Sequence, residues 1–212
     1  MPSEAPQALL FDLGGVLVDI DFDLAISDWA RYSSMPFEEL KIKFQVDDQY
    51  KRYERGEIQA DEYFDHVATI LKLAASQEQI ATGWNAIFVG EISATRLLVE
   101  AERRSLPCYA FTNTNASHMA YWSTRFPEIV AAFDRIFASH QIGLRKPERA
   151  AFEYICRATG ISAGSFMFFD DLPENIHAAS NTGFQTTLVR SPDDVANALR
   201  GTRAGANAQS CE

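Results

Sequence analysis

The sequence of residues 7–19 is QALLFDLGGVLVD, the most informative stretch of the chain. Its apolar run, Ala8 to Phe11, is typical of a strand buried on both faces of a parallel sheet. The run ends in Asp12, whose carboxylate is costly to bury without a partner. The glycines that follow let the backbone turn sharply and approach a ligand closely. Asp12 is therefore a candidate for chemistry, although an aspartate that caps a turn fits this stretch equally well.

Four further apolar runs predict buried strands. They span residues 107–111, 135–138, 165–169 and 186–189. Amphipathic patterns between them predict helices over 94–104 and 147–159, the second of which ends at Gly160. Alternating strands and helices imply a parallel sheet with helices on both faces, which is a three-layer α/β fold. Right-handed crossovers then bring the carboxyl ends of the strands to one edge, where such sheets bind ligands.

Residues 21–90 break this alternation. The segment shows helical patterns and no strand, and the amphipathic spacing over residues 63–74 is the clearest of them. Because the segment leaves the sheet just after Asp12, we expect it to form a cap that folds over that edge. The small, polar residues at the end of the chain predict disorder. The expected parts are a core of residues 1–20 and 91–200, a helical cap of residues 21–90, and a tail of residues 201–212.

The composition excludes several classes of function. The chain of 212 residues has a formal net charge of −10, which argues against binding nucleic acid or anionic membranes. A phosphorylated substrate stays possible, because a local pocket can be positive on an acidic protein. Three widely spaced cysteines fit a reducing compartment without disulfides. Since there is no signal-peptide pattern and no apolar run long enough to span a bilayer, the cytoplasm is the expected location.

Polar residues follow three more of the predicted strands. Thr112 ends the strand at 107–111, Lys146 lies in the loop after 135–138, and the pair Asp170-Asp171 follows 165–169. Taken alone, Thr112 suits a helix cap and Lys146 a solvated surface. The acid pair suits a helix cap too, but its charges would repel each other and Asp12. A bound Mg²⁺ would remove that repulsion, because Mg²⁺ prefers oxygen ligands.

Together these residues resemble, in order along the chain, the four motifs of the haloacid dehalogenase superfamily of hydrolases. The resemblance covers the chain up to the tail and implies a Rossmann-like core with a small all-helical cap inserted after the first strand. The details are similar to those of the bacterial alpha-glucose-1-phosphate phosphatase group. The segments that carry the likeness are FDLGGV (11–16), VDIDF (18–22), ERGEI (54–58), NTN (113–115), RKP (145–147), FFDD (168–171) and NI (175–176).

The resemblance implies a role for each of these residues. Asp12 would attack phosphorus and form an aspartyl-phosphate, which water would then hydrolyse. Thr112 and Lys146 would hold the phosphate oxygens, and Lys146 would also pair with Asp12. The implied cofactor is Mg²⁺, with ligands from Asp12, the main-chain carbonyl of Gly14, and Asp170 or Asp171.

Three further residues are expected to contact the substrate. Asn113 would assist near the leaving group. Arg55 and Glu57 flank a glycine in a turn that could reach the mouth of the site, although a solvated helix end fits them equally well. The implied substrate is a small phosphorylated metabolite, such as glucose 1-phosphate or another sugar phosphate, and we expect the protein to be a monomer.

Gly14 departs from the superfamily pattern. Typical phosphatases of the superfamily have an aspartate there, which acts as general acid and base and is worth about 10²–10⁴-fold in rate. Either another group donates the proton, or the leaving group needs little help, or turnover is weak. Two alternatives therefore stay open: a 2-haloacid dehalogenase-like hydrolase, which would use no metal, and a catalytically weak binding protein with this fold.

Overall fold

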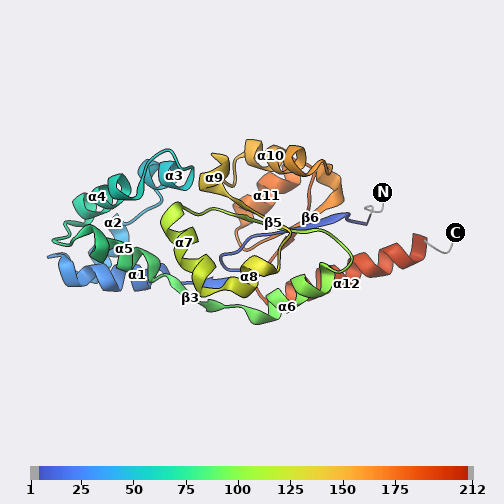
Figure 1. Ribbon diagram of the computed structural model, residues 1–212, viewed down its shortest axis with the longest axis horizontal. Coiled ribbons are helices and arrows are strands. Elements are labelled where there is room, and N and C mark those ends of the chain that lie inside the picture. Colours follow the sequence, from blue (N-terminus) through green and yellow to red (C-terminus); the bar gives the residue numbers. More distant parts are fainter. Residues whose placement is uncertain (1–4, 210–212) are drawn as a thin grey trace.

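The computed structural model describes residues 5–209, with side chains for residues 5–201. Figure 1 shows a group of helices on the left and a sheet covered by helices on the right. The sheet has five parallel strands in the order β5-β4-β1-β6-β7. This arrangement confirms the predicted Rossmann-like α/β fold, and each strand begins within one residue of its expected position. The strands are β1 (Ala8–Phe11), β4 (Cys108–Thr112), β5 (Arg135–Ala138), β6 (Phe166–Asp170) and β7 (Gln185–Leu188).

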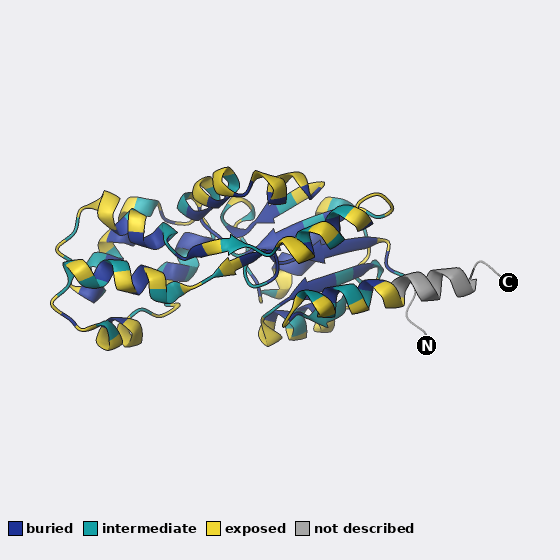
Figure 2. Ribbon diagram, turned by 90° about the horizontal axis from the view of Figure 1, so that it is seen from below, coloured by how far each residue is buried: buried dark blue, intermediate teal, exposed yellow. Residues whose placement is uncertain are grey.

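Side chains that alternate along β1 divide the core helices between the two faces of the sheet. Leu9 and Phe11 pack with apolar side chains of α6, α7, α8 and α12, whereas Ala8 and Leu10 pack with those of α10 and α11. Figure 1 shows these groups below and above the sheet, and Figure 2 shows buried strands between helices with exposed outer sides. The helices are α6 (Ser93–Glu102), α7 (Ala116–Arg125), α8 (Pro127–Ala131), α9 (Ser139–Ile142), α10 (Arg149–Thr159), α11 (Pro173–Asn181) and α12 (Pro192–Gln209).

The strand order places the ends of β4, β1 and β6 side by side. Phe11 pairs with Ala110 of β4 and with Phe169 of β6. The Asp12 amide continues this ladder by donating to the Phe169 carbonyl at 2.8 Å. Because all three strands are parallel and end together, Asp12 lies between the last residues of its two neighbours.

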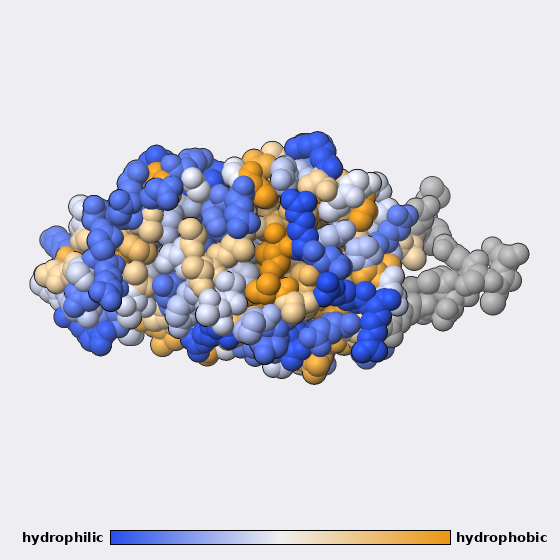
Figure 3. Space-filling view, viewed as in Figure 1, coloured by the Kyte–Doolittle hydropathy of each residue, from blue (hydrophilic) through white to orange (hydrophobic). Residues whose placement is uncertain are grey.

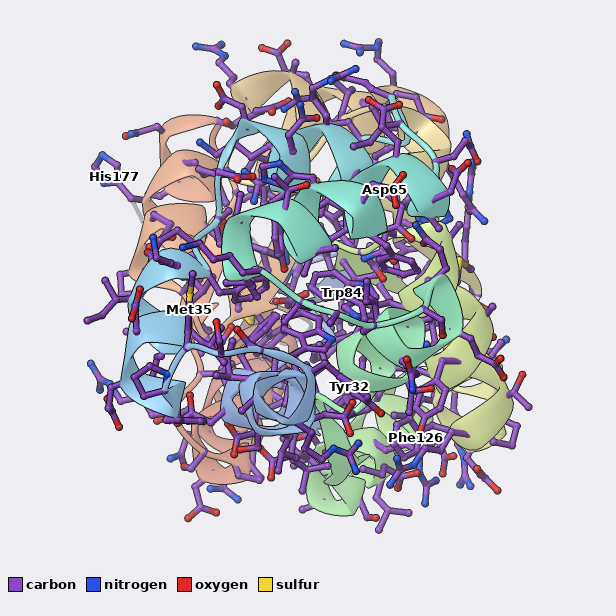
Figure 4. The ribbon with its side chains drawn as sticks, turned by 90° about the vertical axis from the view of Figure 1, so that its left-hand side faces the viewer. Tyr32, Met35, Asp65, Trp84, Phe126 and His177 are labelled. Carbon is purple, nitrogen blue, oxygen red and sulfur yellow. The ribbon has the colours of Figure 1, made fainter. Side chains whose placement is uncertain are left out.

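The cap is built around Trp84, which is fully buried. Its indole stacks on that of Trp29, with ring centroids 6.2 Å apart, and packs against the rings of Tyr50 and Tyr63. Figure 4, which looks onto the cap end of the molecule, shows Trp84 in the interior between the cap helices. These helices are α1 (Phe22–Trp29), α2 (Phe37–Lys43), α3 (Asp48–Glu54), α4 (Ala60–Leu71) and α5 (Gln77–Asn85).

Two short strands connect the cap to the core. β2 (Val18–Ile20) and β3 (Phe88–Glu91) pair antiparallel, so the outgoing and returning chains lie side by side. The expectation of no strand before residue 90 was therefore wrong. The four residues of β3 include a glycine and show too little alternation of apolar and polar side chains to predict a strand. β3 forms because its backbone groups hydrogen-bond to those of β2.

The end of the chain also differs from the expected disorder. Helix α12 continues to Gln209, and residues 210–212 of the expected tail lie outside the described residues. Cys108 and Cys156 are free thiols. Within the described part of the chain, no helix is both long and apolar enough to cross a bilayer. Figure 3 shows hydrophilic residues over much of one face, interrupted by a band of apolar residues across its middle.

The cap docks on the core through aromatic and polar contacts. The Trp84 ring stacks on His118 of α7 at 4.2 Å, and His118 Nε2 donates to the Trp84 carbonyl at 2.9 Å. Burial lowers the pKa of His118 to about 3, so this imidazole is neutral. Gly56, in the turn after α3, has a φ of 68° and lies against the main-chain carbonyl of His140, where a Cβ would collide with it. The turn can therefore approach the core only because it has no side chain there.

We predict that Gly56→Ala destabilises the protein more than Gly160→Ala. Both glycines have a left-handed φ, 68° and 73°, but open space surrounds a Cβ at Gly160. Gly160→Ala should cost about 1 kcal/mol of backbone strain, and Gly56→Ala about 2 kcal/mol or more because the cap must also move away. Urea unfolding of both variants measures this difference, and equal losses would show that the Gly56 contact contributes nothing.

Candidate active site

A single ammonium group joins the predicted residues at the carboxyl edge of the sheet. Lys146 Nζ lies 2.8 Å from Asp12 Oδ1 and 2.7 Å from Asp170 Oδ2. The side chain of Lys146 is 1% exposed and that of Asp170 is fully buried. Burial alone would lower the pKa of Lys146, but the charges of Asp12 and Asp170 outweigh it and raise that pKa. The lysine is thus a fixed positive charge among carboxylates, not the solvated lysine that its residue type favours.

Asp12 is held by its own loop. Its Oδ1 accepts a hydrogen bond from the Leu13 amide at 2.7 Å, in addition to the Lys146 contact. Burial raises the pKa of Asp12 to about 7, and the Lys146 charge opposes this rise. A divalent cation beside this carboxylate would favour its ionised form further. The site is therefore suited to a carboxylate that becomes reactive when a cation is present.

Asn113 positions Lys146. Its Oδ1 accepts from the Lys146 amide at 2.8 Å, and its Nδ2 donates to the Lys146 carbonyl at 2.9 Å. Asn113 also lines the cavity, and its contact with the leaving group stays a prediction. Asn113 fixes the loop after β5 against the end of β4, and the Lys146 side chain is thereby aimed at Asp12.

The two adjacent aspartates have different environments. Asp170 is fully buried and accepts hydrogen bonds from the Leu172 amide and from Asn175 Nδ2, besides the Lys146 contact. Asp171 is partly exposed and lines the cavity. Asp170 thus has its oxygens engaged within the protein, whereas Asp171 presents its carboxylate to the cavity.

Three carboxylates meet at this place. Asp12, Asp170 and Asp171 each offer one oxygen, and these atoms lie within 4.8 Å of one another. Gly14 lines the cavity next to them. A set of hard oxygen donors with excess negative charge fits Mg²⁺ or another hard divalent cation. This donor set agrees with the ligands that the sequence suggests.

The second glycine of the first motif, Gly15, is required by the shape of the loop. Its φ is 70°, and a Cβ at this position would collide with the Asp171 carboxylate. Gly14 is less constrained, because a Cβ there would meet only the Ile20 side chain, at 3.1 Å. The loop after β1 therefore needs glycine at position 15 for Asp171 to approach, whereas position 14 has room for a side chain if Ile20 shifts.

A cavity of about 650 Å³ lies over this edge, between core and cap. Asp12, Thr112, Lys146 and Asp171 line its inner end. Among the described residues, the Thr112 side chain makes one long contact, 3.5 Å, to the Asn113 carbonyl, so its hydroxyl is available to a ligand. The expected nucleophile, hydroxyl, lysine and acid thus line one cavity, and such a cavity is the default place for a substrate.

Arg55 and Glu57 do not line this cavity. The Arg55 guanidinium pairs with Glu57 at 2.5 Å and with Glu148 of the core at 3.2 Å, so it serves the docking of the cap. Among the cap residues that line the cavity is Glu54, which pairs with Arg145 at 2.7 Å. Sequence reasoning missed Glu54, although its spacing from Tyr50 and Lys51 on one helix face was a usable signal.

Comparisons with known proteins agree with this geometry. The chain is 25% identical over 184 residues to D-ribitol-5-phosphate phosphatase of Bacteroides thetaiotaomicron, with 84% of this chain and 89% of that protein covered. It is 28% identical over 192 residues to a phosphatase of Mycobacterium tuberculosis, with 86% and 87% covered. A solved HAD-family enzyme of Bacteroides thetaiotaomicron, in complex with magnesium and inorganic phosphate, has a TM-score of 0.77 and 27% identity, with 87% of this chain and 94% of that chain covered.

The family follows from the extent of the match. Residues 6–183 fit the family described as haloacid dehalogenase-like hydrolase, a range that includes the whole cap and every residue of the cavity described above. The order of the strands, the cap inserted after β1 and the acids around Lys146 are in accord with this assignment. The chain belongs to the haloacid dehalogenase-like hydrolase family.

Proposed function

We propose that this protein is a Mg²⁺-dependent phosphatase that hydrolyses a small phosphorylated metabolite, a sugar phosphate such as glucose 1-phosphate, through an aspartyl-phosphate. The observation that carries this proposal is the placement of Lys146 between Asp12 and Asp170 on the wall of the cavity between core and cap. The phosphatases among the relatives, and the related enzyme with magnesium and phosphate bound, support it. The cytoplasm and a monomeric state remain part of the proposal.

The chain's own residues divide the chemistry between them. Asp12 attacks phosphorus, and the bond to the leaving oxygen breaks as the aspartyl-phosphate forms. Lys146 and the Thr112 hydroxyl donate to the phosphate oxygens, where charge must be held during transfer. Water then attacks the aspartyl-phosphate and releases inorganic phosphate and free Asp12.

The metal ligands follow from the difference between the two aspartates. We propose that Asp12 and Asp171 contact the cation directly, with the Gly14 carbonyl, and that Asp170 orients Lys146. Support comes from the hydrogen bonds that engage Asp170 and from the position of Asp171 on the cavity wall. When bound, Mg²⁺ would neutralise charge on the transferring phosphoryl group.

Gly14 leaves the leaving group without the usual proton donor. A sugar 1-phosphate departs as a relatively acidic hemiacetal hydroxyl, so it requires less help than an ordinary alcohol. This is the reason for proposing a sugar 1-phosphate first among the candidate substrates.

The decisive variant is Asp12→Asn. We expect it to abolish hydrolysis of both glucose 1-phosphate and p-nitrophenyl phosphate, because an amide does not form the acyl-phosphate. The loss should be at least about 10³-fold in kcat, measured by release of inorganic phosphate with Mg²⁺ present. Asp193→Asn, an exposed aspartate in the first turn of α12, is the matched control and should retain full activity. Activity that survives Asp12→Asn contradicts the mechanism.

Removal of the metal gives a second test. Treatment with EDTA should abolish phosphatase activity, and excess Mg²⁺ should restore it. Asp171→Asn should raise the Mg²⁺ concentration needed for half-maximal activity by about 10-fold or more, because a charged ligand is lost. Phosphatase activity that is undiminished in EDTA would contradict the metal dependence. Hydrolysis of 2-chloropropionate that persists in EDTA would instead favour the dehalogenase alternative.

Gly14→Asp tests the missing proton donor. A Cβ at this position meets only the Ile20 side chain, at 3.1 Å, so a small shift of Ile20 admits it. We expect kcat to rise for a substrate with a poor alcohol leaving group, such as ribitol 5-phosphate, by about 10-fold or more. p-Nitrophenyl phosphate, whose leaving group needs no proton, is the internal control and should not gain. Absence of any selective gain would mean that another group already donates the proton.

A further inference from the structure

The cavity extends from the phosphate end to a polar wall formed by α3 and the loop before Lys146. Tyr50, Lys51 and Glu54 have the i, i+1, i+4 spacing that places side chains on one side of a helix, and all three line the cavity. Arg145 meets them from the core. Apolar side chains also line the cavity, among them the rings of Phe22, Phe88 and Trp122.

Glu54 and Arg145 form an ion pair inside this wall. Arg145 Nε donates to Glu54 Oε2 at 2.7 Å, and the two side chains are only 6% and 13% exposed. Among the described residues, no donor bonds to the other Glu54 oxygen, and no acceptor bonds to the Arg145 Nη groups. Neither residue is among those with fully buried, unsatisfied polar atoms. The unused donors and acceptor are therefore open to a molecule in the cavity.

Fastening the cap does not by itself account for this pair. A buried ion pair often contributes little net stability, because both charges must leave water. The more exposed Arg55–Glu148 pair, the Gly56 turn and the Trp84–His118 stack already join cap and core. The pair does place a carboxylate and a guanidinium on the cavity wall. There, Arg145 offers planar hydrogen-bond donors and Glu54 offers an acceptor to a molecule in the cavity.

We propose that Glu54 and Arg145 are specificity-determining residues that bind hydroxyl groups of the leaving group. This inference rests on the phosphatase function proposed above and narrows its substrates to phosphate esters of polyols and sugars. Glu54 accepts from one hydroxyl, Arg145 donates to another, and the aromatic rings that line the cavity cover the C–H face of the carbon chain or ring. Pockets of this kind combine an apolar lining with a few fixed polar groups that set orientation.

The same arrangement excludes apolar leaving groups. A substrate without hydroxyls would leave the buried Glu54 oxygen and the Arg145 Nη groups desolvated and unpaired. Sites built to hydrogen-bond a substrate hydroxyl reject analogues that lack it far more strongly than apolar pockets reject an extra group. The Glu54–Arg145 pair thus disfavours a substrate without hydroxyls, because binding such a substrate removes water from these charged groups without replacing its hydrogen bonds.

The test compares esters that differ in hydroxyl content. kcat/KM is measured with Mg²⁺ for glucose 1-phosphate, ribitol 5-phosphate and pentyl phosphate; pentyl phosphate has the five-carbon chain of ribitol 5-phosphate without its hydroxyls. The wild type should prefer the better hydroxylated ester over pentyl phosphate by about 100-fold or more. Glu54→Gln should lower kcat/KM for that ester by about 10- to 100-fold, mainly through KM, and leave pentyl phosphate nearly unchanged.

Two further variants keep the result interpretable. Arg145→Lys retains the charge but loses the planar donors, and should show the same selective loss even if Glu54→Gln folds poorly. Glu62→Gln is the matched control, because Glu62 pairs with Arg52 on the outer side of the cap and does not line the cavity. It should change neither substrate. Thermal unfolding reports whether each variant is folded.

Each result shows whether Glu54 and Arg145 select the substrate or only hold the cap on the core. Equal losses on all esters, no loss, or a wild type that hydrolyses pentyl phosphate as well as the hydroxylated esters overturns the inference. In those cases, hydrolysis of p-nitrophenyl phosphate that depends on Asp12 would leave the phosphatase function standing. Failure to hydrolyse any ester, p-nitrophenyl phosphate included, overturns the proposed function itself.

Discussion

The ammonium of Lys146, enclosed with Asp12 and Asp170, is the interaction on which the site depends. Three carboxylates lie within 4.8 Å of one another at the end of a buried sheet, and such a cluster is stable only if positive charge is near. Asn113 fixes the backbone of Lys146, and Asn175 with the Leu172 amide fixes Asp170. The remaining negative charge faces the cavity, where a divalent cation fits.

The cap gives this reactive edge its enclosure. Its aromatic core around Trp84 is continuous with the apolar cluster on one face of the sheet, and the stack on His118 and the close approach of Gly56 to His140 hold it over Asp12. The division between parts is physical: the core supplies the charged residues around Asp12, and α3 supplies side chains to the same cavity. In the proposed function, substitutions in α3 therefore change substrate choice without altering the residues that hold the phosphate.

Most of the fold and half of the site are readable from local patterns. β1, β4 and β6 are apolar runs that end in Asp12, Thr112 and Asp170, and parallel strands necessarily bring these ends together. β3 was missed because its four residues carry no clear alternation. Arg55 and Glu57 were expected near the mouth of the site because they flank a glycine in a predicted turn. In the structure, Arg55 instead pairs with Glu57 and with Glu148, and these ion pairs hold it where the cap docks on the core.

Local patterns in the sequence were enough to predict the α/β architecture, the inserted helical segment and the candidate residues that follow β1, β4 and β6, because these depend on periodicity and on residue types at strand ends. The partners and the burial of those residues depend on the three-dimensional packing. Asn113 binds backbone 33 residues away in the chain, Asp170 is enclosed while Asp171 faces the cavity, and Glu54 meets Arg145 across 91 residues. Burial and partner choice depend on which segments pack together, and no local pattern records contacts between segments so distant in the chain.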